Sequence, residues 1–445
     1  MPICGEIPLR KILLLVPKGN GPGNHKKCNK DWPDELEQLI DKNLWKIVTP
    51  GILVIASLID RGKYEVELID EEFQNINPEN RYDIVAMYIV TPTAKRGYHW
   101  AQHFRSMGAY VVMGGVHTSM CPDEASQYCD TVFTGEAEYT WPQFLADYEK
   151  NQPRPRYAQS VGQADITASP VPAFQLIPGA ARRIIPVQTA RGCPHGCKFC
   201  NLRGLYGQTY RAKTIPQVRR EIESVLQLGG KPVIYFTDDN FFCNPERSRA
   251  FMEEIREYKL TWYTHSDISL GKEEPLLELA FSSGCRQVLI GLESINSADL
   301  SGIDENNFKS RHAKDYLELI NRIQSHGIGV VGSFIVGLDH DDARTFEKLY
   351  DFITASHLFG ASITVNTPYP GTRLYEEAGR NGWIESHDWD EYTIFQPVCK
   401  TKDLPPAEFN REYVRLLERI HSPANILRKI NYFKEQLKKM NGKKP

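Results

Sequence analysis

Short apolar runs alternate with amphipathic stretches along the first third of the chain. Two stretches, 51–62 and 98–108, carry apolar residues at helical spacing and end in glycine. Strands that alternate with helices form a parallel sheet with crossover helices. Residues 1–150 are therefore predicted to form an open, doubly wound α/β domain. The runs predicted as its strands are 11–17, 64–70, 83–90, 109–115 and 130–135.

Residues 151–183 interrupt this alternation. The stretch is rich in Pro and Ala, and neither helical spacing nor a strand pattern continues through it. It is typical of a connection that crosses the surface between two domains. We therefore expect a linker here.

A second series of strands and helices occupies residues 184–388. Six β/α units are fewer than the eight that close a TIM barrel, so the pattern predicts a partial, open (β/α)6 barrel with its site at the carboxyl ends of the strands. Residues 389–445 are expected to be mainly helical and to end in a basic tail. The predicted barrel strands are 184–190, 233–242, 260–269, 287–294, 330–338 and 361–369.

Composition narrows the class of protein. The 445 residues are 41% hydrophobic and 24% charged, which is ordinary for a globular protein, and a formal charge of −3 gives no reason to expect nucleic acid as a partner. No run reaches the roughly 18 uninterrupted apolar residues of a membrane-spanning helix. The apolar run near the N-terminus is also too short for a signal peptide. We expect a cytoplasmic protein, whose ten cysteines stay reduced.

Three of those cysteines stand close together in the segment RGCPHGCKFC. Cys193, Cys197 and Cys200 follow the first predicted barrel strand, where a barrel enzyme places its reactive group. Their C-x3-C-x2-C spacing differs from the paired C-x2-C of zinc ribbons, and His195 between them is expected to be a loop residue rather than a ligand. A [4Fe–4S] cluster held by three thiolates, with one iron left open, is the preferred interpretation over a structural zinc site.

With aromatic Phe199 before the last cysteine, this segment resembles the C-x3-C-x-aromatic-C signature of the radical S-adenosylmethionine (SAM) superfamily. The resemblance implies that the open iron binds SAM, and that reductive cleavage of SAM gives a 5′-deoxyadenosyl radical that takes hydrogen from a small-molecule substrate. It also implies an external one-electron reductant such as flavodoxin or ferredoxin.

Other predicted strand ends resemble SAM contacts of that superfamily. The turn after the second barrel strand could equally cap a helix, and the acid after the fourth could be a solvated loop carboxylate. The segment after the fifth strand would support the adenine through backbone and apolar contacts. The residues so assigned are Asp238, Asp239, Asn240, Glu293, Ser294, Val336 and Gly337.

The pairing of a doubly wound domain with this barrel resembles the class of radical SAM enzymes that carry an N-terminal cobalamin-binding domain. Segments 49–57, 82–94, 111–125 and 135–145 match that class in order. The glycines would allow close approach of a corrin or its nucleotide tail, although tight turns explain them too. The residues assigned to cobalamin are Thr91, Thr93, Gly114, Gly115, His117, Gly135 and Glu136.

One departure concerns the D-x-H-x-x-G motif, whose histidine ligates cobalt in many cobalamin domains. After the second predicted strand this chain has DEEFQN, residues 70–75, with no histidine. A bound cobalamin would then have an empty, water-filled or differently occupied lower position. The alternative is a degenerate domain that keeps the fold without the cofactor.

The leading hypothesis is a C-methyltransferase in which a substrate radical takes a methyl group from methylcobalamin. The alternative is an enzyme of the same architecture that cyclises, rearranges or couples its substrate without methyl transfer. A non-catalytic electron-transfer or sensor protein would normally need a fourth protein ligand to its cluster. The basic tail is either a solvated helix or a contact with a membrane surface or an acidic partner.

Overall fold

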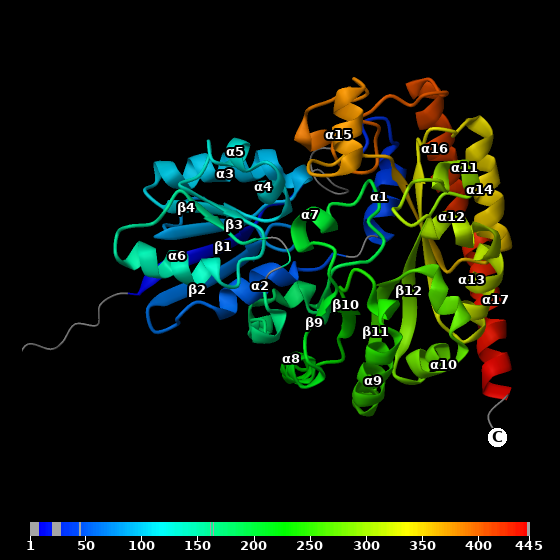
Figure 1. Cartoon of the computed structure of the whole chain (residues 1–445), viewed down its shortest axis with the longest axis horizontal. Coiled ribbons are helices and arrows are strands. Elements are labelled where there is room, and N and C mark those ends of the chain that lie inside the picture. The colour runs from blue at the N-terminus through cyan, green and yellow to red at the C-terminus, as the bar shows by residue number, and fades with distance from the viewer. Residues whose placement is uncertain (1–8, 20–27, 44–45, 161, 163, 443–445) are drawn as a thin grey trace, which may run out of the picture.

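The computed structural model describes residues 9–19, 28–43, 46–160, 162 and 164–442. Two six-stranded sheets form the framework. Figure 1 shows them side by side, with the N-terminal sheet in blue and cyan and the second sheet in green to yellow. This arrangement confirms the predicted fold class, a doubly wound domain followed by a partial barrel.

The N-terminal sheet has the order β2-β1-β3-β4-β5-β6 and is parallel throughout. Leu13 and Leu15 pack on one face, with α3, and Ile12 and Leu14 pack on the other. Because both faces are covered, its strands are continuous apolar runs. The strands are β1 (Arg10–Val16), β2 (Tyr64–Asp70), β3 (Ile84–Tyr88), β4 (Tyr110–Gly114), β5 (Thr131–Thr134) and β6 (Arg156–Ala158).

Strand order reverses between β1 and β3, which is where open α/β sheets leave a crevice beyond their carboxyl ends. The helices of this half are α1 (Asp34–Asn43), α2 (Pro50–Ser57), α3 (Ala94–Ser106), α4 (Val116–Met120), α5 (Pro122–Ala125) and α6 (Thr140–Glu149).

The short edge strand β6 lies within the stretch whose sequence shows no strand pattern. It pairs with β5 over three residues, and Pro155 immediately precedes it. A three-residue strand is too short to show alternation, so the sequence pattern missed it.

All six predicted barrel strands are present, in the parallel order β7-β10-β11-β12-β13-β14. The end strands β7 and β14 do not pair, which confirms a partial barrel. The strands are β7 (Ile184–Val187), β10 (Val233–Phe236), β11 (Thr261–Ser266), β12 (Cys285–Glu293), β13 (Gly329–Val336) and β14 (Gly360–Val365).

Helices connect these strands, and a small antiparallel ribbon of β8 (Ala190–Arg191) and β9 (Arg211–Ala212) follows β7. The connecting helices are α7 (Leu202–Tyr206), α8 (Ile215–Gln227), α9 (Pro245–Ile255), α10 (Glu274–Ser282), α11 (Ser297–Leu300), α12 (Phe308–His312), α13 (Tyr316–Ser325) and α14 (Ala343–Ala355).

The closing segment is mainly helical, as predicted. After α15 (Arg373–Arg380), helix α16 (Pro406–Ile420) buries Phe409 and Tyr413 in the core, and α17 (Pro423–Gly442) runs along the outside of the barrel (Figure 1). Within the described ranges, no helix is both long and apolar enough to cross a membrane.

Gly115, at the end of β4, gives a first prediction. Its φ is 109°, and an added Cβ would lie 2.5 Å from the Ile89 carbonyl oxygen. Gly115→Ala should lower the free energy of unfolding by about 2 kcal/mol or more, because left-handed strain and a backbone clash add. Gly108→Ala is the control, since Gly108 has φ 89° with nothing within 4 Å of the added Cβ. Equal losses in urea unfolding would contradict the clash.

Candidate functional site

A cavity of about 610 Å3 opens at the carboxyl ends of the barrel strands. The three cysteines lie on its wall, and the strand ends supply polar side chains. The cavity also reaches Val90, Thr91, Pro92 and Val116 of the N-terminal domain. A cavity therefore lies where the site is predicted, at the strand ends, and both domains line it.

The loop that carries the cysteines leaves the β8–β9 ribbon through two glycines with positive φ. Gly192 has φ 96°, and an added Cβ would lie 2.5 Å from the Thr209 carbonyl oxygen, while Gly196 has φ 60°. Burial raises the pKa of the Cys197 thiol to about 12 and that of Cys200 to about 11. Because metals bind thiolates, occupation of this site must displace protons.

Sulfur spacing separates the two metal interpretations. A single zinc ion holds its thiolate ligands within about 4 Å of one another. In the described part of the chain, the only group of His, Cys, Asp or Glu whose ligand atoms all lie within 4.8 Å consists of His117, Cys121 and Glu124. The three loop thiols are not such a group, so at least two of their sulfur atoms lie more than 4.8 Å apart, which is wider than the ligand spacing around a single zinc ion.

Asp239 and Asn240 line the cavity beside the cysteines, as predicted. Asp239 accepts a hydrogen bond from the Gly192 amide at 2.8 Å, and burial raises its pKa to about 6. Asn240 Nδ2 donates to Asp267 Oδ2 at 2.7 Å, and His195 Nε2 lies 2.9 Å from the same oxygen. Sequence reasoning missed Asp267, which follows β11 without a recognisable motif.

Asp238 does not line the cavity. Its carboxylate is buried and accepts hydrogen bonds from the Thr189 amide at 2.6 Å, the Thr189 hydroxyl at 2.5 Å and the Ala190 amide at 3.1 Å. Asp239, by contrast, lines the cavity, so the two neighbouring carboxylates point to different surroundings. The structure gives Asp238 the task of fixing the turn between β7 and β8.

Glu293 faces the cavity from a β-bulge at the end of β12. Its φ is 65°, a conformation that non-glycine residues rarely adopt and that is found at functional sites. Lys309 Nζ lies 2.8 Å from Glu293 Oε1 and donates to the Gly291 carbonyl oxygen at 2.7 Å. Burial opposes the charge of Lys309, but Glu293 raises its pKa. Lys309 lies 16 positions along the chain from Glu293, and sequence reasoning missed it.

The remaining predicted SAM contacts fall beside the cavity rather than in it. Ser294 follows Glu293, and its hydroxyl accepts a hydrogen bond from the Asn296 amide at 3.0 Å. Val336 packs in the core, and the Gly337 amide donates to Asp341 at 2.8 Å. The inward residues of β13 are Ser333 and Ile335, because strand side chains alternate. The predicted segment therefore borders the cavity, and the residues that line it are neighbours of the two named from the sequence.

A second cavity, of about 150 Å3, lies at the carboxyl ends of β3, β4 and β5. Three predicted glycines line it: Gly114, Gly115 and Gly135. The Gly135 amide donates to the Ser119 hydroxyl at 3.0 Å, which ties two strand-end loops together. Apolar side chains of α2 form another wall. The cavity therefore lies at the carboxyl ends of the strands on the β3 side of the switch point.

A buried ion-pair network joins the two domains beside this second cavity. Arg191 Nη1 lies 2.5 Å from Glu136 Oε1, and its Nη2 lies 2.6 Å from Glu138 Oε1. Arg211 Nη1 lies 3.0 Å from Glu136 Oε2. Burial opposes the charge of Arg191, but Glu138 and then Glu136 raise its pKa. Glu136 is predicted to contact cobalamin. Its carboxylate instead forms ion pairs at the domain junction, although the residue also lines the cavity.

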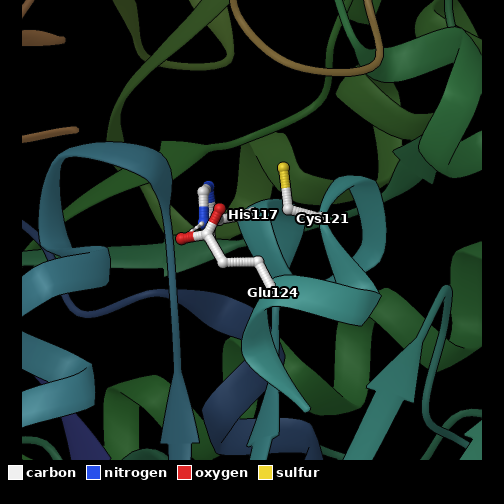
Figure 2. A group of neighbouring side chains, drawn as sticks. All are labelled: His117, Cys121 and Glu124. Atoms are coloured by element: carbon white, nitrogen blue, oxygen red, sulfur yellow. Dashed lines mark ion pairs between the residues drawn. The ribbon is translucent and has the colours of Figure 1, made fainter. Parts of the chain in front are cut away.

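His117 is fully buried in a polar cluster, shown in Figure 2 with Cys121 and Glu124. Its Nδ1 lies 3.2 Å from the Thr91 hydroxyl, and its Nε2 lies 3.1 Å from the Tyr98 hydroxyl. Glu124 accepts a hydrogen bond from the Trp389 indole at 2.8 Å. Protein partners thus satisfy both ring nitrogens. His117 does not line either large cavity but supports Thr91, which does.

Thr93, the other predicted threonine, is buried and bonded to the backbone. Its hydroxyl donates to the Val90 carbonyl oxygen at 3.0 Å and accepts from the Val90 amide at 3.2 Å. Thr93 therefore shapes the loop on which Thr91 is presented. Of the polar residues predicted beside cobalamin, Thr91 is the one whose loop opens into the larger cavity.

Comparison with known proteins agrees with this geometry. Residues 187–353 match the family model described as the radical SAM superfamily. This segment begins at the end of β7 and includes the three cysteines.

Relatives match most of the chain. The bacteriochlorophyllide d C-12(1)-methyltransferase of Chlorobaculum tepidum is 27% identical, with 91% of this chain and 90% of the relative covered. The anaerobic magnesium-protoporphyrin IX monomethyl ester cyclase of Rubrivivax gelatinosus is 23% identical over 84% of this chain and 69% of the relative.

One solved structure shares the fold of both halves. It is the radical S-adenosylmethionine methyltransferase TsrM from Kitasatospora setae with cobalamin and a [4Fe–4S] cluster bound. The TM-score is 0.69 at 16% identity, with 94% of this chain and 90% of that chain covered.

The domain junction gives a second prediction. Arg191→Met would leave Glu136 and Glu138 without their shared partner, so the free energy of unfolding should fall by about 3–5 kcal/mol. Arg154→Met is the matched control, since Arg154 is 51% exposed and pairs with Asp147 at the surface. That change should cost less than about 1 kcal/mol. Similar urea midpoints for the two variants would contradict the role given to Arg191.

Proposed function

Because this chain belongs to the radical SAM superfamily, we propose that it is a cobalamin-dependent radical SAM enzyme that transfers a methyl group to a carbon atom of a small-molecule substrate. The cofactors would be a [4Fe–4S] cluster, SAM and cobalamin. The name of the Chlorobaculum relative, a C-methyltransferase matched over most of both chains, supports this reaction.

One observation carries the proposal: a single cavity is lined by the cysteine loop and by the loops of the N-terminal domain. Cys193, Cys197 and Cys200 stand on its barrel side, and Thr91 and Val116 stand on the other. Group transfer requires the donor and the reacting carbon to meet in one water-excluding space. The cavity that both sets of loops line gives these groups a common space.

When bound, the cluster with SAM would supply a hydrogen-abstracting radical, and methylcobalamin would supply the methyl group. The protein's own task is to bind and orient these groups. We propose that the three cysteines hold three irons and leave the fourth for SAM. Asp239, Asn240, Glu293 and the inward residues of β13 would line the SAM site, with Phe199 beside the cluster.

Lys309 would act as a positioning residue for Glu293. The salt bridge fixes the direction of the carboxylate in a buried position, where an unpaired charge would be costly. An ionised carboxylate can accept hydrogen bonds from an amino or ribose hydroxyl group of SAM.

The smaller cavity would take the nucleotide tail of cobalamin. Its lining combines three backbone glycines with the apolar residues of α2. Gly114, Gly115 and Gly135 leave the backbone uncovered at the strand ends, so a flat group can approach closely. The corrin would then lie over the Thr91 loop, between this crevice and the cysteines.

A second candidate function is cyclisation, rearrangement or coupling without methyl transfer. The similarity to the Rubrivivax cyclase favours it. Product mass distinguishes the two, because methyl transfer adds one CH2 to the substrate.

The reaction also needs an external one-electron donor, for which we propose a flavodoxin or a ferredoxin. We further propose a cytoplasmic location. In the part of the chain that the structure describes, no disulfide joins any of the nine cysteines.

The proposal predicts a definite cofactor content. After anaerobic reconstitution with iron, sulfide and hydroxocobalamin followed by desalting, the protein should retain about four irons and four sulfides per chain. About one corrin per chain should remain with them. Four irons without corrin would contradict the cobalamin part and favour the second candidate. With methyl-labelled SAM and a substrate candidate, label in the product would establish the transfer.

Cys197→Ala should remove most of the iron and abolish cleavage of SAM to 5′-deoxyadenosine, because the cluster would lose a ligand. Cys399→Ser is the control, since Cys399 lies outside the cysteine loop and does not line the cavity. If Cys197→Ala kept deoxyadenosine production, the cluster assignment would be wrong.

A further inference from the structure

The outer side of helix α17 carries an unusual set of exposed apolar side chains. Ile426, Leu427, Ile430 and Leu437 are 40%, 58%, 44% and 46% exposed, and together they form what we call the α17 patch. Nine large hydrophobic side chains of the described residues are exposed, and four of them stand on this one helix. Such clustering on a folded protein marks an interaction surface.

Aromatic contacts hold the helix on the barrel beside the exposed patch. Tyr432 stacks on His357 with ring centroids 4.4 Å apart, and Phe433 meets Phe359 edge to face at 5.3 Å. Ile426, Ile430 and Leu437 stand at helical spacings of four and seven residues, so they share one face. Phe433 stands three residues after Ile430 and four before Leu437, so the docked side of α17 adjoins the apolar stripe, whose side chains remain partly exposed along its edge.

Cations border the patch. Between Pro423 and Gly442 the chain has five basic residues and one acidic residue, Glu435, although the whole chain has a formal charge of −3. Lys434 and Lys438 follow Ile430 at intervals of four residues, so these exposed side chains run beside the apolar stripe. An apolar stripe bordered by lysines is typical of helices that lie in the interface of an anionic bilayer.

We propose that α17 binds the surface of a membrane rich in anionic lipids, with the α17 patch among the acyl chains and its lysines at the headgroups. A second copy of the chain is less suitable, because a symmetric pairing of two such helices would bring like-charged lysines together. Figure 1 shows α17 on the outer side of the barrel, away from the N-terminal sheet. Binding there leaves the cavity between the domains uncovered, and it does not depend on the proposed reaction.

The test uses the full-length protein and vesicles of phosphatidylcholine with or without phosphatidylglycerol. The protein should sediment with the anionic vesicles and at least about tenfold less with neutral ones. High salt should release part of the bound protein, because screening weakens the lysine contribution. Negligible sedimentation with anionic vesicles would overturn the proposal.

Two variants separate the apolar and the cationic parts. Leu427→Glu with Ile430→Glu should weaken partitioning about tenfold or more, because two apolar side chains no longer enter the acyl region. Lys434→Gln with Lys438→Gln should weaken it roughly 30-fold, and it leaves the apolar residues in place.

The matched control is Leu226→Glu with Leu317→Glu. These leucines are 36% and 43% exposed and stand on α8 and at α13. The control should bind anionic vesicles as the unchanged protein does. Equal loss in this control and in the α17 variants would overturn the assignment to α17. A dimer in light scattering that the α17 variants dissociate, without vesicle binding, would assign the patch to a second copy instead.

Discussion

The buried ion-pair network around Arg191 is the constraint on which the architecture of the site depends. Arg191 belongs to the short ribbon that follows β7, two residues before Cys193, and its partners Glu136 and Glu138 follow β5 of the other sheet. A buried guanidinium needs both carboxylates, and the carboxylates need it. The cysteine loop and the strand-end loops of the N-terminal domain are thereby held at one junction.

At that junction, loops from both parallel sheets line one cavity. A parallel sheet presents its loops at the carboxyl ends of its strands, and each half of this chain has such an edge. Because the edges meet, the larger cavity is lined by the cysteines on one side and by the Thr91 loop on the other. His117, shown in Figure 2, supports that loop through the contact of its Nδ1 with the Thr91 hydroxyl, while its Nε2 contacts the Tyr98 hydroxyl.

The sequence revealed most of the framework and the residues whose spacing is local. The cysteine motif, the six barrel strands and the glycines at β4 and β5 follow from patterns within a few residues. Ile335 and Val336 show the limit of prediction from such local patterns. The motif identified the segment, but only the register of β13 shows which neighbour faces inward. Asp238 and Asp239 differ in the same way.

Residues that act through long-range contacts could not be predicted from the sequence. Lys309 and Asp267 have no motif of their own, and their partners Glu293, Asn240 and His195 come from other loops. The sequence pattern assigns Glu136 to a cofactor, because nothing near it in the sequence shows that it pairs with Arg191, which lies 55 positions away. Tertiary structure alone brings such charges together, so a single sequence cannot pair them.

The account's central claim is that the cluster and the corrin share one cavity. Electron paramagnetic resonance of the reconstituted protein, with the cluster reduced and cobalamin as cob(II)alamin, tests it most directly. We predict that the cob(II)alamin signal relaxes faster when the cluster is reduced and paramagnetic than when it is oxidised and diamagnetic, because a fast-relaxing spin in the same cavity speeds the relaxation of its slower neighbour. Unchanged relaxation at stoichiometric corrin would contradict the shared cavity.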